Sequence, residues 1–313
     1  PMFSSLGYTI NWTQLLDTGG TIFSDSLFQI KNAVSERELP TLLYDKVKDV
    51  EGGEEDSLSL YKAKLTMPFA VQINTASLAA SADKFAAQND LFRAVSGAEQ
   101  PLITDVSSQI NNGMISLAVT GGKKVIYFYG TNTGENPVTV YVDGQPVKIP
   151  ASSYFENEQY PNDFCNGLVC LGAFENQNVL IQFATGAPVT DLHVGVLDYT
   201  LLEQTASRLN TTGMQVENLK QKHSGATFDV KNAEKGTIFI PVPFDKNWIC
   251  RVNGENVSDQ VTSIDGMMGI PVAEGTNTIS IKYQAEGRVQ GGIITFAALL
   301  ICCSVWLLNR RGF

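Results

Sequence analysis

The most constraining feature of this sequence is an uncharged apolar segment close to its C-terminus. The segment Gly291–Leu308, GGIITFAALLICCSVWLL, runs for 18 residues without a charged side chain. As an α-helix with a rise of 1.5 Å per residue it would be roughly 27 Å long, which is enough to cross the hydrocarbon core of a bilayer. A helix buried in a soluble core normally keeps a polar face, and this segment has none. We therefore predict a transmembrane helix over residues 291–308.

The charges that flank this segment predict its orientation. Arg310 and Arg311 follow almost at once, and by the positive-inside rule they place residues 309–313 in the cytoplasm. Residues 1–290 would then be extracytoplasmic, and they carry 32 acidic but only 20 basic side chains. This balance is unusual for a cytoplasmic loop. It also makes a nucleic-acid partner improbable, because phosphate binding needs clustered Lys and Arg.

The outer region divides into segments that differ in their apolar pattern. Residues 1–105 mix short strands with helix, and residues 106–200 form one strand-rich segment after another. A linker helix is expected at 201–211, followed by a second strand-rich segment at 212–288. We predict a mainly β fold with some α: a mixed α/β N-terminal segment, two tandem β-sandwich domains of jelly-roll type, and the C-terminal transmembrane helix.

Two local patterns support this division. Residues 82–97 have apolar side chains at helical spacing, with Ser81 as the expected cap and Gly97 as the stop. The stretches VDGQPV (Val142–Val147) and VNGENV (Val252–Val257) share the pattern V-[D/N]-G-x-x-V. Asp-Gly and Asn-Gly are preferred in tight hairpin turns, because both turn positions need positive φ. Two β-sandwich domains with similar hairpins are the economical interpretation, and a duplication is one way in which they could have arisen.

Metal and thiol chemistry receive little support. The two histidines, His193 and His223, lie thirty residues apart without a neighbouring Cys or His at ligand spacing, and His193 is expected to be structural. We expect no metal and no cofactor. Cys165 and Cys170 could form a local disulfide in an oxidising compartment, although two buried thiols explain their spacing almost as well. The acidic run at 49–57 lacks calcium-loop spacing and is expected to be a solvated loop.

The stretch GGTIFSDSLFQIK resembles a functional motif. We expect Gly19 and Gly20 to turn the chain, and Ser24 and Asp25 to cap the turn that follows. The alternative is that Asp25 faces a groove on the membrane side. Several aromatic residues could stack on a sugar ring, although core packing is the more common role of such side chains; they are Trp12, Trp248, Tyr127, Tyr129 and Tyr160.

Longer stretches resemble one protein family. The sequence LGYTINWTQLLDTGGTIFSDSLFQIKNAVS resembles the start of the extracytoplasmic C-terminal region of the bacterial YfhO family. LSLYKAKLTMPFAVQIN, FAAQNDLFRAVSG, IFIPVPFDKNWICRVNGENV and GIPVAEGTNTISIKY follow in the same order, so the resemblance covers essentially the whole chain. It departs at Asn32–Ala33, where an aromatic would be expected, and at Asn247, where a glycine would be more typical.

The resemblance implies a function and a set of partners. YfhO proteins are polytopic membrane proteins with a lipid-sugar-dependent glycosyltransferase fold, which implies sugar transfer from a polyprenyl-phosphate carrier to teichoic or lipoteichoic acid. In such enzymes the carboxylate that takes part in the reaction lies in an early external loop. We therefore expect no catalytic residue in this chain, and we expect an upstream transmembrane half of the same protein as its partner. The resemblance implies a bacterial cell membrane location. Candidates for a glycan groove are Asp25, Ser24, Trp12 and Asp17.

A different class of function stays open. The chain could be a stand-alone, membrane-tethered β-sandwich module that binds glycan or protein without catalysis. Roughly ten apolar spans upstream would favour the glycosyltransferase, whereas a signal peptide there would favour the module. A purely structural role without any ligand is the third alternative.

Overall fold

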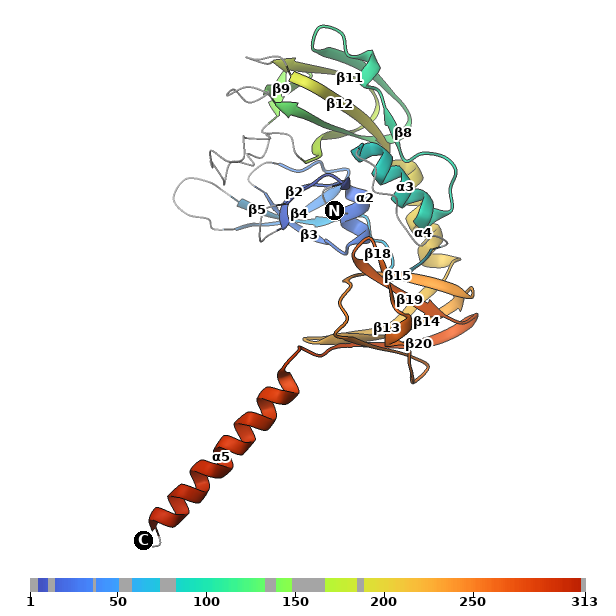
Figure 1. Cartoon of the computed structure of the whole chain (residues 1–313). Coiled ribbons are helices and arrows are strands. Elements are labelled where there is room, and N and C mark those ends of the chain that lie inside the picture. Colours follow the sequence, from blue (N-terminus) through green and yellow to red (C-terminus); the bar gives the residue numbers. More distant parts are fainter. Residues whose placement is uncertain are drawn as a thin grey trace.

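The computed structural model shows a β-rich body from which one long helix projects (Figure 1). Among the residues that the structure describes, every strand pair is antiparallel, and the strands belong to five sheets. This confirms the predicted mainly β fold with some α. The structure describes residues 5–10, 15–35, 38–50, 58–73, 83–132, 139–147, 167–184 and 189–310.

The described part of the N-terminal segment contains short strands and the helices α2 and α3. Its first two strands pair with each other, and β3, β5 and β4 form a three-stranded sheet. The elements are β1 (Tyr8–Ile10), β2 (Leu15–Gly19), α2 (Ile22–Leu27), β3 (Asn32–Ser35), β4 (Tyr44–Val50), β5 (Leu58–Ala63), β6 (Val71–Ile73) and α3 (Lys84–Ser96). The expected acidic loop between β4 and β5 lies largely outside the described residues.

Helix α3 confirms the helix predicted at 82–97, with one correction at its start. The cap is Asp83 instead of Ser81, because the Asp83 carboxylate accepts a hydrogen bond from the backbone N–H of Ala86 at 2.7 Å. Gly97 ends the helix in the left-handed conformation, with φ of 68°. The buried face carries Leu91 and Phe92, which point into the body.

The first β unit is a single six-stranded sheet that bends over on itself. Its order is β10-β9-β11-β8-β12-β7, and β8 runs for 19 residues. The pairing of β8 with β11 is interrupted at Gly121–Gly122, and Leu117 and Phe128 on either side of this point enter the same core. The strands are β7 (Ile103–Asp105), β8 (Met114–Asn132), β9 (Thr139–Val142), β10 (Gln145–Val147), β11 (Val169–Ala184) and β12 (Val189–Asp198).

The second β unit is a sandwich of two separate sheets, reached through helix α4 (Tyr199–Thr211). One sheet has the order β13-β14-β20-β16-β17, and the other has the order β18-β19-β15-β6. Strand β6 therefore comes from the N-terminal segment and pairs with β15, with Ile73 opposite Thr237. The remaining strands are β13 (Gln215–Lys222), β14 (Gly225–Ala233), β15 (Gly236–Pro243), β16 (Trp248–Val252), β17 (Glu255–Asn256), β18 (Thr262–Ile264), β19 (Met267–Val272) and β20 (Gly275–Tyr283).

The two predicted hairpins have the same geometry. Asp143 and Asn253 have φ of 49° and 54°, and the glycines that follow them also have positive φ. Each turn residue bonds the neighbouring strand twice. The Asp143 carboxylate accepts from Leu180 N at 2.8 Å, and the Asn253 side chain accepts from Thr278 N at 2.9 Å. The two hairpins are therefore anchored in the same way, although the sheets that carry them differ in strand order; a duplication stays a prediction.

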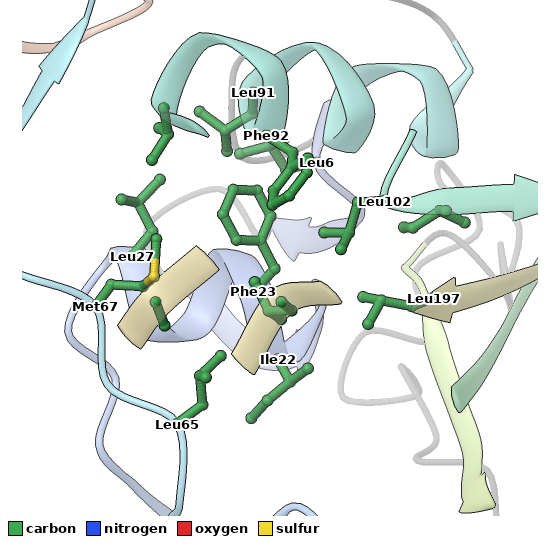
Figure 2. Packing of buried hydrophobic residues seen from close by; sticks show 14 of the residues in the cluster. Leu6, Ile22, Phe23, Leu27, Leu65, Met67, Leu91, Phe92, Leu102 and Leu197 are labelled. Atoms are coloured by element: carbon green, nitrogen blue, oxygen red, sulfur yellow. The ribbon is translucent and has the colours of Figure 1, made fainter. Parts of the chain in front are cut away.

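A central core joins the N-terminal segment to both β units. Phe23 of α2 meets Phe92 of α3 edge to face, with ring centres 5.5 Å apart (Figure 2). Leu197 of the first unit and Phe239 of the second are fully buried in the same cluster. Since one core contains residues from all three sequence segments, burial of that core stabilises their mutual arrangement.

Helix α5 (Arg288–Arg310) contains the predicted transmembrane segment. Within it, Gln290–Leu307 is long and apolar enough to cross a membrane, and none of this stretch is buried by the rest of the chain. Figure 1 shows it leaving the body alone. Exposed side chains such as Ile294 and Phe296 would be unfavourable in water and suit a lipid environment.

Candidate functional site

The motif GGTIFSDSLFQIK forms the start of a short helix and its capping interactions. Thr21, not Ser24 or Asp25, is the N-cap of α2. Its side chain accepts from Ser24 N, while the Ser24 hydroxyl accepts from Thr21 N at 2.9 Å. This reciprocal pair is a capping box in which serine takes the place usually held by Glu or Gln. Ser24 thus takes part in capping as expected, but as the third residue of the helix and not as the N-cap.

Gln88 of α3 connects this cap to the turn that precedes β1. Its side-chain amide accepts from the Thr21 hydroxyl at 2.9 Å and donates to the carbonyl of Leu6 at 2.7 Å and to Ser24 Oγ at 3.2 Å. Gln88, Thr21 and Ser24 are all at most 1% exposed. We call these residues, together with Tyr8, Asp25 and Tyr127, the buried network.

Tyrosines close the buried network on two sides. The Tyr8 hydroxyl donates to Asp25 Oδ1 at 2.5 Å, and its oxygen lies 3.0 Å from the Ser24 hydroxyl. The Tyr127 hydroxyl accepts from Ile22 N at 3.0 Å, which satisfies another free N–H at the start of α2. Burial raises the pKa of Tyr127 well above its usual range. The buried network therefore ties α2, α3, β1 and β8 together.

The two glycines of the motif are required by their surroundings. Gly19 and Gly20 have φ of 118° and 74°, as expected for residues that turn the chain. A Cβ atom on Gly19 would lie 2.2 Å from the carbonyl oxygen of Gly7, and one on Gly20 would lie 2.4 Å from the Tyr8 ring. The motif is consequently a packing signature, with its polar atoms directed inward.

The residues expected to line a glycan groove differ in their burial and in how far the structure describes them. Ser24 is fully buried, and Asp25 is half-buried with Tyr8 on its carboxylate. Trp12 lies outside the described residues. Asp17 belongs to β2, and its side chain is not among those described. Their assignment to a glycan groove stays a prediction.

A second cluster, which the sequence did not reveal, lies about the start of α3. Asp83, Asp105 and His193 each bring one potential ligand atom within 4.8 Å of the others. Nδ1 of His193 lies 3.6 Å from Asp105 Oδ2, and the side chains are 31% and 41% exposed. We call these three residues, with Tyr129, the Asp-Asp-His cluster.

Tyr129 forms the floor of this cluster. Its ring stacks on the His193 ring with centres 4.5 Å apart and planes 6° from parallel, and its hydroxyl donates to Asp83 Oδ2 at 3.3 Å. The Lys84 ammonium lies 4.9 Å from the centre of the same ring. Burial, and then the charge of Asp83, raise the pKa of Tyr129 above its usual range. His193 is therefore structural in its stacking, as expected, and it also belongs to a polar cluster.

The remaining chemical expectations are mostly untested. Cys165 lies outside the described residues, so the pairing with Cys170 stays a prediction. Cys250 is buried, and burial raises the pKa of its thiol to about 12. Tyr160 also lies outside the described residues. Trp248 is half-buried and packs edge to face on Tyr283 at 5.1 Å, which agrees with the expected core role.

The fold and the comparisons together assign the chain to a class. The chain combines a body of antiparallel sheets with an exposed apolar helix long enough to span a membrane, which fits a membrane protein with a large domain outside the bilayer core. The chain belongs to the YfhO family: the family model for "Bacterial membrane protein YfhO" matches residues 1–295. No curated protein and no solved structure matches the chain.

Proposed function

We propose that this chain is the extracytoplasmic C-terminal part of a YfhO-type membrane glycosyltransferase. The full protein would transfer a sugar from a polyprenyl-phosphate carrier to an envelope polymer such as teichoic or lipoteichoic acid. The family match over residues 1–295 carries this proposal. The catalytic centre would lie in the membrane-embedded half, upstream of these residues.

The role of the outer part in this proposal is to cap that half and help shape the acceptor groove. A single core that fixes three sequence segments supports a rigid cap, because rigid elements position a groove better than separately hinged domains. Arg310 beyond the spanning segment supports the proposed orientation, because under the positive-inside rule it would be the cytoplasmic flank. Residues 1–290 would then face the envelope.

Deletion of the gene in its native host tests the function. Loss of sugar from teichoic or lipoteichoic acid, restored by the intact gene, is the expected result. Unchanged glycosylation of both polymers would contradict the proposal. It would favour the alternative of a membrane-tethered module that binds glycan or protein without catalysis.

Asp25→Ala in the full-length protein tests the signature motif separately. We expect reduced protein levels with a matching reduction in glycosylation, because Asp25 accepts from Tyr8 inside the body. Normal protein levels with lost glycosylation would instead place Asp25 in the groove. Normal levels with normal glycosylation would remove the motif from any functional role. Asp90→Asn, on the exposed side of α3, is the matched control.

A further inference from the structure

We propose that Asp83, Asp105 and His193 bind one divalent transition-metal ion. Their potential ligand atoms lie within 4.8 Å of one another, and His193 Nδ1 is 3.6 Å from Asp105 Oδ2. Two ligands held about 2.1 Å from a tetrahedral metal lie roughly 3.4 Å apart, so the His–Asp pair is nearly at the required spacing. Only a small inward movement of the third carboxylate completes the set.

The buried nitrogen of His193 is the observation that points to a ligand. Nδ1 is the one buried side-chain N or O atom, among the residues that the structure describes, without a hydrogen-bond partner. The 3.6 Å separation from Asp105 is too long for a hydrogen bond. A buried polar atom left in this state costs about 1–3 kcal/mol. Coordination of a metal by Nδ1 would remove that cost.

Both carboxylates are held in place by hydrogen bonds from neighbouring groups. Asp105 Oδ1 accepts from Ser107 N at 2.7 Å and from the Ser107 hydroxyl, which leaves Oδ2 directed at His193. Asp83 Oδ1 accepts from Ala86 N at 2.7 Å. Outer contacts of this kind orient the ligands in metal sites. The cluster therefore has a supporting shell as well as ligands.

The ring of His193 is fixed in a similar way. It lies flat against Tyr129, whose hydroxyl donates to Asp83 Oδ2. Val194 N donates to the hydroxyl of Ser107, so the strand that carries His193 is joined directly to the turn that holds Asp105. The imidazole is thus held beside the carboxylates, although the three candidate ligands come from a helix cap and two strands.

The donor set selects the class of metal. Two carboxylates and one imidazole suit Mn²⁺, Fe²⁺ or Zn²⁺ better than Ca²⁺ or Mg²⁺, which prefer oxygen donors alone. His193 and Asp105 are 31% and 41% exposed, so water or an anionic group can complete the coordination. The nearby Lys84 ammonium opposes a cation but offsets only one of the two carboxylate charges.

Titration of the 313-residue chain in detergent with Mn²⁺ and with Zn²⁺, after treatment with a chelator, tests the site. We expect saturable binding of one ion per chain. The affinity should be at least 10- to 100-fold weaker in His193→Ala and in Asp105→Asn, because loss of even an outer-shell partner of a metal ligand has an effect of that size. His223→Ala is the matched control, because His223 is exposed in the β13–β14 turn, and it should bind as the wild type does. Absence of saturable binding, or wild-type affinity in His193→Ala, would overturn the proposal.

Electron spin echo spectroscopy of the bound Mn²⁺ keeps the proposal falsifiable if a variant folds poorly. The wild-type protein should show modulation from an imidazole nitrogen bound to the ion. Bound Mn²⁺ without nitrogen modulation would place the ion on other ligands and overturn the assignment. Neither measurement depends on glycosylation, so the metal site and the proposed function stand or fall separately.

Discussion

The buried network and the Asp-Asp-His cluster share a strand but differ in how their polar atoms are satisfied. Tyr127 and Tyr129 are two residues apart in β8 and so lie on the same face. Tyr127 accepts from a backbone N–H in a closed core, whereas Tyr129 supports a half-exposed histidine with an unpartnered nitrogen. The comparison indicates that paired polar atoms hold the fold together, and that an unpaired buried nitrogen in a partly exposed side chain is available to a ligand.

The largest loss of stability should follow from adding a side chain at Gly19, in the turn that precedes the buried network. Gly19→Ala places a methyl group 2.2 Å from a backbone oxygen at a φ of 118°, and we expect it to cost about 3–5 kcal/mol. Gly97→Ala is the control. It also has positive φ but open space around its Cβ, so it should cost about 1 kcal/mol. Chemical unfolding checks both, and equal losses would contradict the steric argument.

Removal of the central amide should have the next largest effect. Gln88→Leu keeps the volume but leaves the Leu6 carbonyl and the Thr21 hydroxyl without their buried partner, for a loss of about 2–3 kcal/mol. At roughly 2–4 °C per kcal/mol, the Tm should fall by about 5–10 °C. Gln72→Leu removes a similar amide from an exposed site and should lower the Tm far less. A wild-type Tm in Gln88→Leu would contradict the stabilising role assigned to the Gln88 hydrogen bonds.

Alkaline pH should weaken the fold through both tyrosines. Their folded-state pKa values are raised by burial, so the unfolded chain loses these protons first. The resulting stability is fully present below about pH 10 and is lost as the pH rises above it. The free energy of unfolding, measured from pH 8 to 12, should fall less steeply in Tyr129→Phe. An unchanged slope in that variant would show that Tyr129 ionises normally in the folded state.

The smallest effect on the free energy of unfolding should come from a substitution in the Asp-Asp-His cluster. His193→Ala removes a half-exposed ring and an unsatisfied nitrogen together, and without metal we expect a change within about 0.5 kcal/mol. Thermal unfolding in the presence of a chelator checks this. A loss of 2 kcal/mol or more would mean that the cluster is part of the structural core.

Features set by neighbouring residues could be predicted from the sequence. The Asp-Gly and Asn-Gly hairpins, the stop at Gly97 and the apolar helix α5 each depend on chemistry within a few residues. The family resemblance, confirmed over residues 1–295, also rests on continuous stretches. Ser81 was the wrong cap because a Ser and an Asp two residues apart are equally good candidates, and only the backbone geometry selects Asp83.

Features set by distant residues could not be predicted. Strand β6 joins a sheet whose other strands begin more than 160 residues later in the chain, and no local pattern encodes that partner. Gln88 lies 64 residues from Ser24 but bonds to it. The Asp-Asp-His cluster has no ligand spacing because its members come from a helix cap and two strands. Spacing along the chain detects metal sites only where the ligands are close in sequence.

Metal-dependent thermal unfolding of two variants tests the division between the regions most directly. Tyr8→Phe loses the hydroxyl that donates to Asp25, so we expect a lower Tm and the full wild-type rise on addition of Mn²⁺. We expect His193→Ala to unfold at the wild-type Tm without metal and to show no rise with Mn²⁺. If the two variants respond alike, either both keeping the Mn²⁺-dependent rise or both losing it, the account is contradicted.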